Sequence, residues 1–341
     1  MSYEEVVTFE NLYKAMRKCR NGVAWKDTVA RYTADGLKET YRLRQDLLNG
    51  TYKIKPYQLF IVTDPKRREV KASNIRDRQF QKSLCRNGLY NDLTKSLIRD
   101  NYACQKNRGV DDALNRMGAH LHRYYRKHGS TGWVLKCDIR HYFAETDHEI
   151  AKAVVRKRVA DDRVCKAVDQ IIDSFGENEG IGLGSEVSQL IELSVLDDLD
   201  HFIKERLRIK HYLRYMDDFI LIHPDKEYLS YCLREITKRL DAIGLKLNKK
   251  TQLFPIKHGI IWLKWRFILT DTGKVIRKIS SKSISREKRK LRNLKRLLDQ
   301  GKITADVPLE SIKSWEAAAR RGNTDAVIAD MWKYYHSLFH K

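Results

Sequence analysis

Two adjacent carboxylates, Asp217 and Asp218, are the residues whose types and spacing point most directly to chemistry. They stand between an apolar pair at 212–213 and an apolar run at 219–222. Neighbouring side chains on a straight strand point to opposite faces, so both can reach one ligand only if the chain bends there. A hairpin over 211–223 with both acids at its tip could hold a divalent metal ion. Aspartate is also common in solvated turns, and these residues alone leave that alternative open.

Asp138 is the best candidate for a third carboxylate. It lies near the end of the apolar segment 133–139, which predicts a buried strand. Two-metal phosphoryl transfer needs acids that hold two cations about 3.5–4 Å apart, one at the attacking 3′ oxygen and one at the leaving pyrophosphate. Hard oxygen ligands favour Mg²⁺. Other acids, such as Asp147 and Asp197, fit helix caps or exposed helix positions better.

The charge of the chain indicates a polyanionic partner. The 341 residues carry a formal net charge of +23, which points to nucleic acid before a merely soluble basic surface. No apolar run reaches the roughly 18 residues of a membrane-spanning helix, so we expect no membrane partner. The acidic start lacks an apolar signal segment, which predicts a cytoplasmic protein. Six scattered cysteines without a Cys-x-x-Cys pair argue against a zinc knuckle or a disulfide framework.

Apolar periodicity and turn signals divide the chain into three parts. Residues 1–130 predict helices with a short β region that ends in a basic turn at 65–68. Residues 131–270 predict strand, helix, hairpin, helix and strand, the order of a split β-α-β sheet. Residues 271–341 predict a basic helical region. The expected helices cover 10–16, 34–48, 77–89, 187–207 and 228–240, and one more starts at a capping box over 146–149. The expected strands cover 57–62, 133–139 and 244–248.

The helix expected over 285–298 combines a packing face with a charged face. Its leucines recur at three- and four-residue spacing, which indicates one buried side. Its other residues are almost all Lys or Arg. A solvated charged face is the usual meaning of such a run, but nearly pure cation favours contact with a phosphate backbone.

Several ordered motifs together resemble the bacterial reverse transcriptases over nearly the full length. Residues 137–143 resemble the first catalytic motif of that family, and 215–218, Tyr-Met-Asp-Asp, match its second motif residue for residue. The remaining matches are the fingers motif at 102–109, the template- and nucleotide-positioning motif at 180–189, the palm segment at 244–251 and the primer-grip position at 262–267. Lys264 stands where the primer grip often has glycine.

The resemblance implies an α+β right-hand polymerase with fingers (1–130), a split β-α-β palm (131–270) and a helical thumb (271–341). It implies an RNA-directed DNA polymerase that uses two Mg²⁺ ions, with Mn²⁺ as the expected substitute, and that binds template RNA, an RNA or DNA primer and dNTPs. The implied catalytic residues are Asp138, Asp217 and Asp218, and the metal site also includes Ile139. The implied primer and template residues are Tyr215, Met216, Lys250, Leu263, Lys264, Trp265, Arg108 and Gly109.

The resemblance also implies a nucleotide site. In the family a bulky ring at the position of Phe143 occupies the space of a 2′-hydroxyl and so selects deoxynucleotides; a core phenylalanine is the alternative, with Tyr142 the better core candidate. Arg68 and Arg78 match positions that contact the triphosphate, and a plain RNA-phosphate contact is their alternative. Arg67 and Lys71 are near-equivalent candidates. The full implied set is Arg68, Arg78, Phe143, Leu183, Gly184 and Gln189.

The motif at 180–189 favours one subgroup. Intron-type enzymes usually have Gln where Leu183 stands, whereas enzymes of diversity-generating retroelements have an apolar residue there, followed by Ser-Gln as at 188–189. The same group commonly has proline where Gly182 stands. An apolar side chain cannot hydrogen-bond near the nucleotide, which predicts low fidelity; simple packing of Leu183 under the template is the equal alternative.

Two other functions stay open at this point. The chain could be an antiphage-defence reverse transcriptase that copies a dedicated noncoding RNA. It could also be an RNA-binding, maturase-like helper, against which the three intact aspartates argue. An accessory protein or a structured noncoding RNA is the expected additional partner.

Overall fold

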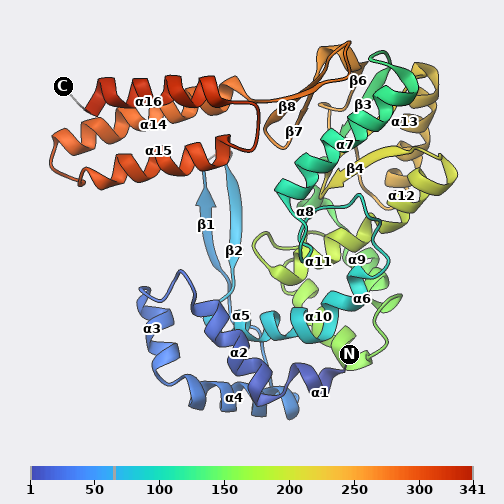
Figure 1. The fold of residues 1–341 in the computed structure, drawn as a ribbon. Helices are drawn as coiled ribbons and strands as arrows, with labels where there is room; N and C mark the ends of the chain where they lie inside the picture. Colours follow the sequence, from blue (N-terminus) through green and yellow to red (C-terminus); the bar gives the residue numbers. More distant parts are fainter. Residues whose placement is uncertain (1, 64–66, 340–341) are drawn as a thin grey trace. The chain divides into compact units, whose positions relative to one another are not determined.

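A computed structural model describes residues 2–63 and 67–339 (Figure 1). The chain forms two compact units. The first unit comprises Met1–Asn107, Cys137–Phe219 and Tyr231–Thr251, and the second comprises Arg108–Lys136, Ile220–Ser230 and Gln252–Lys341. The three-part division into fingers, palm and thumb stays a prediction. Pro65 and Lys66 of the expected basic turn lie outside the described residues.

Helices make up most of the first 94 residues. Ser2 and Thr8 begin the first two helices, since their hydroxyls accept hydrogen bonds from the backbone N–H groups of Glu5 and Asn11. The expected helices are confirmed, and the one predicted over 77–89 starts earlier and ends in a π-helical turn. The elements are α1 (Tyr3–Val6), α2 (Phe9–Arg20), α3 (Asp27–Ala34), α4 (Gly36–Leu48), α5 (Ile75–Leu84), the π turn Cys85–Leu89 and α6 (Tyr90–Thr94).

A two-stranded hairpin interrupts these helices. Strand β1 (Gln58–Val62) pairs antiparallel with β2 (Arg68–Ala72) and with no other described strand. Every residue of β1 is exposed, although Leu59, Phe60 and Ile61 are apolar. The strand expected over 57–62 is therefore confirmed, and it contributes little to the core.

A four-stranded sheet carries the candidate carboxylates. Its strands are β3 (Trp133–Asp138), β4 (His211–Tyr215), β5 (Asp218–His223) and β6 (Gln252–Pro255), in the order β4-β5-β3-β6. The central residues of β4 and β5 are buried, as their apolar runs predict. The last expected strand was wrong, because residues 244–248 make only one bridge, between Leu247 and Ile139. Gly244, with a φ of +72°, belongs to the turn that ends the preceding helix, and β6 takes the edge position instead.

The helices around the catalytic motifs correct two further expectations. The helix after 146 begins at Asp147, whose carboxylate accepts from the N–H of Ile150, whereas the Thr146 hydroxyl donates to the carbonyl of Tyr142. The helix expected over 187–207 is broken, because Leu196 leaves helical geometry. The elements here are α8 (Tyr142–Glu145), α9 (His148–Arg156), α10 (Asp162–Asp173), α11 (Glu186–Val195), α12 (Asp197–His201), the π turn Phe202–Arg206 and α13 (Lys226–Asp241).

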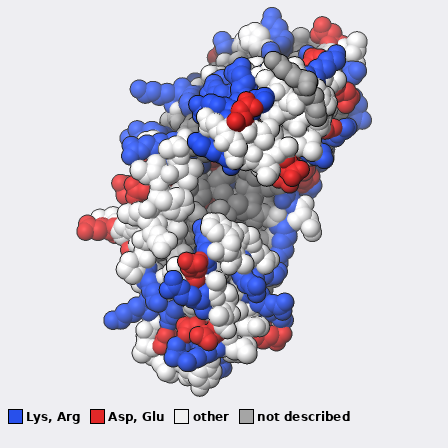
Figure 2. Space-filling view, turned by 90° about the vertical axis from the view of Figure 1, so that its left-hand side faces the viewer, with Lys and Arg blue, Asp and Glu red and all other residues white. Residues whose placement is uncertain are grey.

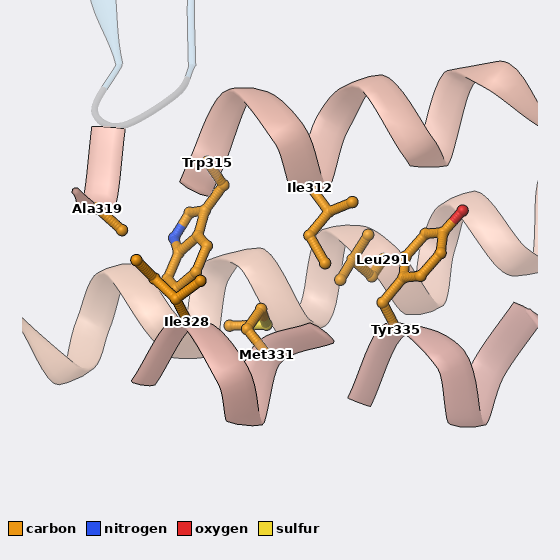
Figure 3. Close-up of a cluster of buried hydrophobic side chains, with 7 residues drawn as sticks. All are labelled: Leu291, Ile312, Trp315, Ala319, Ile328, Met331 and Tyr335. Carbon is orange, nitrogen blue, oxygen red and sulfur yellow. The ribbon is translucent and has the colours of Figure 1, made fainter. Parts of the chain in front are cut away.

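The second unit contains a long helix, a small sheet and a three-helix bundle. Helix α7 (Val110–His128) and the antiparallel strands β7 (Ile260–Trp262), β8 (Trp265–Leu269) and β9 (Val275–Ile279) precede the bundle of α14 (Ser281–Asp299), α15 (Asp306–Ala319) and α16 (Asp325–Phe339). The three helices pack together around an apolar cluster (Figure 3). That cluster consists of Leu291, Ile312, Trp315, Ala319, Ile328, Met331 and Tyr335.

Helix α14 has the two faces that its sequence predicts. Leu291 is buried in the cluster, whereas Arg286, Arg289 and Arg292 are exposed. Lys and Arg side chains are spread over much of the face drawn in Figure 2. Across residues 2–63 and 67–339, none of the helices combines the length and apolarity needed to cross a lipid bilayer.

Candidate active site

Asp217 and Asp218 lie where the sequence analysis expected them, at the end of a hairpin. Strands β4 and β5 are joined by Met216 and Asp217, and Asp218 begins β5. Met216 has a φ of +57°, in the left-handed region that most residues avoid. The tight bend therefore places two consecutive carboxylates at the tip, and it does so at a cost in backbone strain.

Backbone hydrogen bonds bring Asp138 next to this tip. The N–H of Ile139 donates to the carbonyl of Asp217 at 3.2 Å. The carbonyl of Asp138 accepts from the N–H of Asn248 at 2.7 Å, which ties the same strand end to the segment that precedes β6. The first unit thus holds all three catalytic candidates, from two neighbouring strands and the loop between β4 and β5.

The buried thiol of Cys137 feels the charge of two of these carboxylates. Burial raises the pKa of the Cys137 thiol, and the negative charges of Asp218 and Asp138 raise it further. In the part of the chain that the structure describes, however, no three His, Cys, Asp or Glu side chains form a group that could hold a metal ion as they stand. The oxygen donors suit Mg²⁺, and Ile139 contributes its backbone to the same corner.

Glu192 is a buried carboxyl that the sequence analysis missed. It lies on α11 at 0% exposure, and neither carboxylate oxygen has a hydrogen-bond partner among the described residues. The nearby hydroxyls of Tyr142 and Thr146 donate instead to backbone carbonyls, of Glu192 and Tyr142 respectively. Burial raises the pKa of Glu192 to about 8, and the charge of Asp217 adds to the rise. A single acid inside the apolar run 190–193 was the signal that could have revealed it.

Phe143 and Leu183 line one cavity of about 200 Å³ in the first unit. Phe143 is half-buried there, whereas the neighbouring Tyr142 is buried and donates to the carbonyl of Glu192 at 2.6 Å. Lys71 lines the same cavity, and its ammonium donates to the carbonyl of Phe175 at 2.5 Å. The ring is therefore available to a ligand in the cavity, as a gate for the sugar requires.

Gly182, on the wall of this cavity, explains one departure from the family pattern. A Cβ at this position would lie 2.1 Å from the ring of Phe175, far inside van der Waals contact. The ring of Phe175 stacks on that of Tyr57 at 5.0 Å between centroids. A proline at 182 would collide with Phe175, so glycine is required here.

A second cavity, of about 320 Å³, holds other members of the predicted nucleotide set. Arg78, Gly184 and Gln189 line it together with Lys18 and Lys82. Lys18 was not anticipated from the sequence, since it lies on α2, far along the chain from the motifs. Glu186 also lines this cavity and pairs with Lys82 at 2.8 Å, so the lining carries three cations and one carboxylate. This net positive charge suits an anionic group such as a phosphate.

Arg68 lines neither of these two cavities. It is exposed on β2, paired in register with Val62. The predicted nucleotide residues therefore occupy three places: Phe143 and Leu183 in the first cavity, the group around Arg78 in the second, and Arg68 on the β1–β2 hairpin.

The predicted primer and template residues belong to both units. Tyr215, Met216 and Lys250 are in the first unit, whereas Arg108, Gly109, Leu263, Lys264 and Trp265 are in the second. Leu263 and Lys264 form the two-residue turn between β7 and β8, with φ values of +48° and +71°. A tight turn thus forms here although lysine stands where the family often has glycine. Trp265 is buried, and its ring fills the space beside Gly322.

A carboxylate-tipped hairpin at one side of a four-stranded sheet, with helices around it, is typical of right-hand nucleic-acid polymerases. The chain belongs to the reverse transcriptase (RNA-dependent DNA polymerase) family, whose model matches residues 65–263, more than half of the sequence. It is thereby an RNA-directed DNA polymerase by class. The α+β fold predicted from the sequence is confirmed.

The chain is similar to one curated protein and to several solved structures, and the structures support the fold. Protein YkfC of Escherichia coli (strain K12) is 22% identical over 272 residues, which cover 66% of this chain and 70% of YkfC. Telomerase from Candida albicans, solved with a fragment of telomeric RNA, matches with a TM-score of 0.51 at 10% identity over 76% of this chain. Apo telomerase from Candida tropicalis matches with a TM-score of 0.50 at 12% identity over 84% of this chain. The chain spans only 55% and 62% of these two telomerase chains.

Proposed function

We propose that this chain extends the 3′ end of a primer with deoxynucleotides while it copies an RNA template. The backbone pairing that brings Asp138 beside Asp217 and Asp218 carries the proposal. Asp138, Ile139, Asp217 and Asp218 are the proposed holders of two Mg²⁺ ions, or of Mn²⁺ in their place. Bound there, the ions would supply charge stabilisation for an in-line displacement at phosphorus.

The residues around this corner have separate proposed tasks. Phe143 excludes a 2′-hydroxyl from the cavity that it lines, which selects deoxynucleotides. Arg78, with Lys18 and Lys82, provides positive charge for the triphosphate. Tyr215 and Met216 meet the primer end beside the carboxylates. The exposed cations of α14 contact the phosphate backbone, which fits the net charge of +23.

The metal site is tested by Asp217→Asn, which keeps the size of the side chain and removes its charge. We expect primer extension with Mg²⁺ to fall by at least about a thousandfold, since the variant loses a metal ligand that acts in the transition state. Asp198→Asn is the control, because Asp198 is exposed and its ion-pair partners among the described residues are Lys157 and Arg158, neither of which belongs to the proposed metal site. Equal activity of the two variants would refute the assignment.

The subgroup proposal is error-prone reverse transcription in a diversity-generating retroelement. Leu183 lines the cavity that also contains Phe143, where an apolar side chain cannot offer the hydrogen bond that would help to select the matched base. We expect Leu183→Gln to lower misincorporation severalfold in a primer-extension assay that is sequenced product by product. Val187→Ile, a buried apolar change on the same motif, serves as the control. Unchanged error rates in Leu183→Gln would leave packing under the template as the role of Leu183.

The template is tested by sequencing RNA and cDNA that co-purify with the protein. Repeat-derived cDNA altered at adenines would support the retroelement role, with an accessory protein as partner. cDNA of one structured noncoding RNA would replace it by a role in antiphage defence. Bound RNA without any cDNA would favour the maturase-like helper.

A further inference from the structure

Arg214 lies on β4 near the tip of the carboxylate hairpin, three residues before Asp217. Its side chain is fully buried at 0% exposure. A charged side chain is expensive to bury, so its contacts must compensate for the loss of water. The described contacts of Arg214 use all three nitrogens of the guanidinium, and they reach three separate segments of the first unit.

The first segment is helix α12, through a two-pronged ion pair with Asp200. The Nε atom donates to one carboxylate oxygen at 2.7 Å and the Nη2 atom to the other at 2.6 Å. The hydroxyl of Tyr212, two residues earlier on β4, donates to the same carboxylate at 2.5 Å. This geometry needs the planar fork of arginine, which lysine cannot reproduce.

The second segment is the tip of the hairpin itself. The Nη1 atom of Arg214 donates to the carbonyl of Met216 at 3.0 Å. That carbonyl belongs to the peptide that leads into Asp217, and Met216 holds the strained left-handed conformation. The hydrogen bond therefore favours the one backbone arrangement, with positive φ at Met216, that forms the tip of the hairpin.

The third segment is helix α11, where Nη2 also donates to the carbonyl of Leu193 at 3.0 Å. The backbone of Arg214 is tied as well, because its N–H donates to the carbonyl of Asp100 at 2.9 Å and its carbonyl accepts from the N–H of Tyr102 at 3.1 Å. Replacement of a buried ion pair by apolar residues is often neutral or stabilising, so stability alone does not account for this arrangement.

We propose that Arg214, clamped by Asp200, is a positioning residue that holds the Met216–Asp217 peptide in the arrangement needed for metal binding. This inference rests on the proposed function, since it assigns Arg214 to the same metal site. Arg214 touches neither substrate nor metal in this role. It acts through the carbonyl of Met216.

The test compares Arg214→Lys with Arg158→Lys. Arg158 forms the matched control pair, because its side chain is only 8% exposed, donates to Asp197 at 3.0 Å and to the carbonyl of Val154 at 3.2 Å, and contacts no residue of the hairpin in any described hydrogen bond. Mn²⁺ binding is followed by electron paramagnetic resonance without substrate, and kcat and KM for a dNTP are measured separately. Thermal melting establishes how much of each variant is folded.

We expect Arg214→Lys to weaken Mn²⁺ binding about tenfold and to lower kcat at least about tenfold, with KM for the dNTP changed less than about threefold. Arg158→Lys should leave both quantities within about twofold of the wild type even where it lowers the melting temperature equally. Equal behaviour of the two variants would overturn the proposal and leave Arg214 as a structural residue.

A second variant covers the case in which Arg214→Lys does not fold. Arg214→Met combined with Asp200→Asn removes both buried charges and leaves an acceptor for Tyr212. A folded double variant with wild-type Mn²⁺ binding would overturn the proposal, whereas weakened binding would support it. A wild-type protein that neither binds Mn²⁺ nor extends a primer would instead remove the proposed function itself.

The backbone strain at Met216 allows an independent test of the proposal. Glycine adopts a positive φ without the steric cost that Met216 bears. If Arg214 offsets that cost, Met216→Gly should restore part of the Mn²⁺ affinity that Arg214→Lys loses. Strictly additive effects of Arg214→Lys and Met216→Gly on Mn²⁺ affinity in a double-mutant cycle would contradict a role of Arg214 that acts through Met216.

Discussion

The two hairpins β4–β5 and β1–β2 differ in burial and in the contacts that hold them in place. The residues at the centre of β4 and β5 are buried, and Arg214 donates a hydrogen bond to the carbonyl of Met216 at the tip. All of β1 is exposed, and in the described part of the chain its one strand partner is β2. The proposed function requires the buried hairpin to hold its carboxylates in a fixed position, which needs packing and hydrogen bonds around it. The exposed hairpin can change its surface with little loss of stability, so its residues are available for contact with a ligand.

The largest expected contrast comes from one phenylalanine in each hairpin. Phe219 of β5 is fully buried, whereas Phe60 of β1 is 47% exposed. We expect Phe219→Ala to lower the free energy of unfolding by about 3–5 kcal/mol, because it leaves a cavity in the core. Phe60→Ala should change it by less than about 1 kcal/mol. Denaturant unfolding of both variants measures the difference, and similar losses would show that β1 is packed in solution.

The carboxyl beneath the buried hairpin gives a pH-dependent contrast. Glu192 has its pKa raised to about 8 by burial, so between about pH 5 and 8 the folded protein keeps a proton that the unfolded chain has lost. The stability that this proton provides is present at pH 5 and is lost as the pH rises to 8. Glutamine mimics the protonated acid at every pH.

We therefore expect Glu192→Gln and the wild type to have the same melting temperature at pH 5. Above pH 8 the variant should melt at a higher temperature, because its free energy of unfolding should be larger by an amount on the order of 2–4 kcal/mol. Glu149→Gln is the control, since Glu149 is exposed on α9. An advantage of Glu192→Gln that stays constant with pH would mean that the carboxyl is ionised throughout.

The smallest expected effect concerns a third hairpin, β7–β8. Its turn residues Leu263 and Lys264 both have positive φ and no side-chain clamp among the hydrogen bonds of the described chain. Lys264→Gly should raise the free energy of unfolding by about 1 kcal/mol, because glycine bears no steric cost in this conformation. Lys257→Gly, at a position with ordinary φ, should lower it slightly. Destabilisation by Lys264→Gly would show that the lysine side chain makes a contact that offsets the strain.

The local elements were the easiest to predict. The pattern of apolar residues located the carboxylate hairpin, the strand at 133–138 and α14, since each of these elements depends on neighbours in sequence. Predictions failed where distant residues decided the outcome. The motif helix breaks at Leu196, and the segment 244–248 became a turn with one bridge because β6 occupies the sheet edge. Asp147 replaced Thr146 as the cap, since both types can begin a helix.

By itself the sequence determined the family of this protein, through ordered motifs that include three aspartates, and it determined the large excess of cations. Side-chain type and spacing carry that information directly. Only the tertiary structure decided the surroundings of the hairpin tip: the Arg214–Asp200 pair, the positive φ of Met216 and the burial of Glu192. These contacts join α11, α12 and β4, and desolvation acts only after those elements have packed, so no local pattern could reveal them.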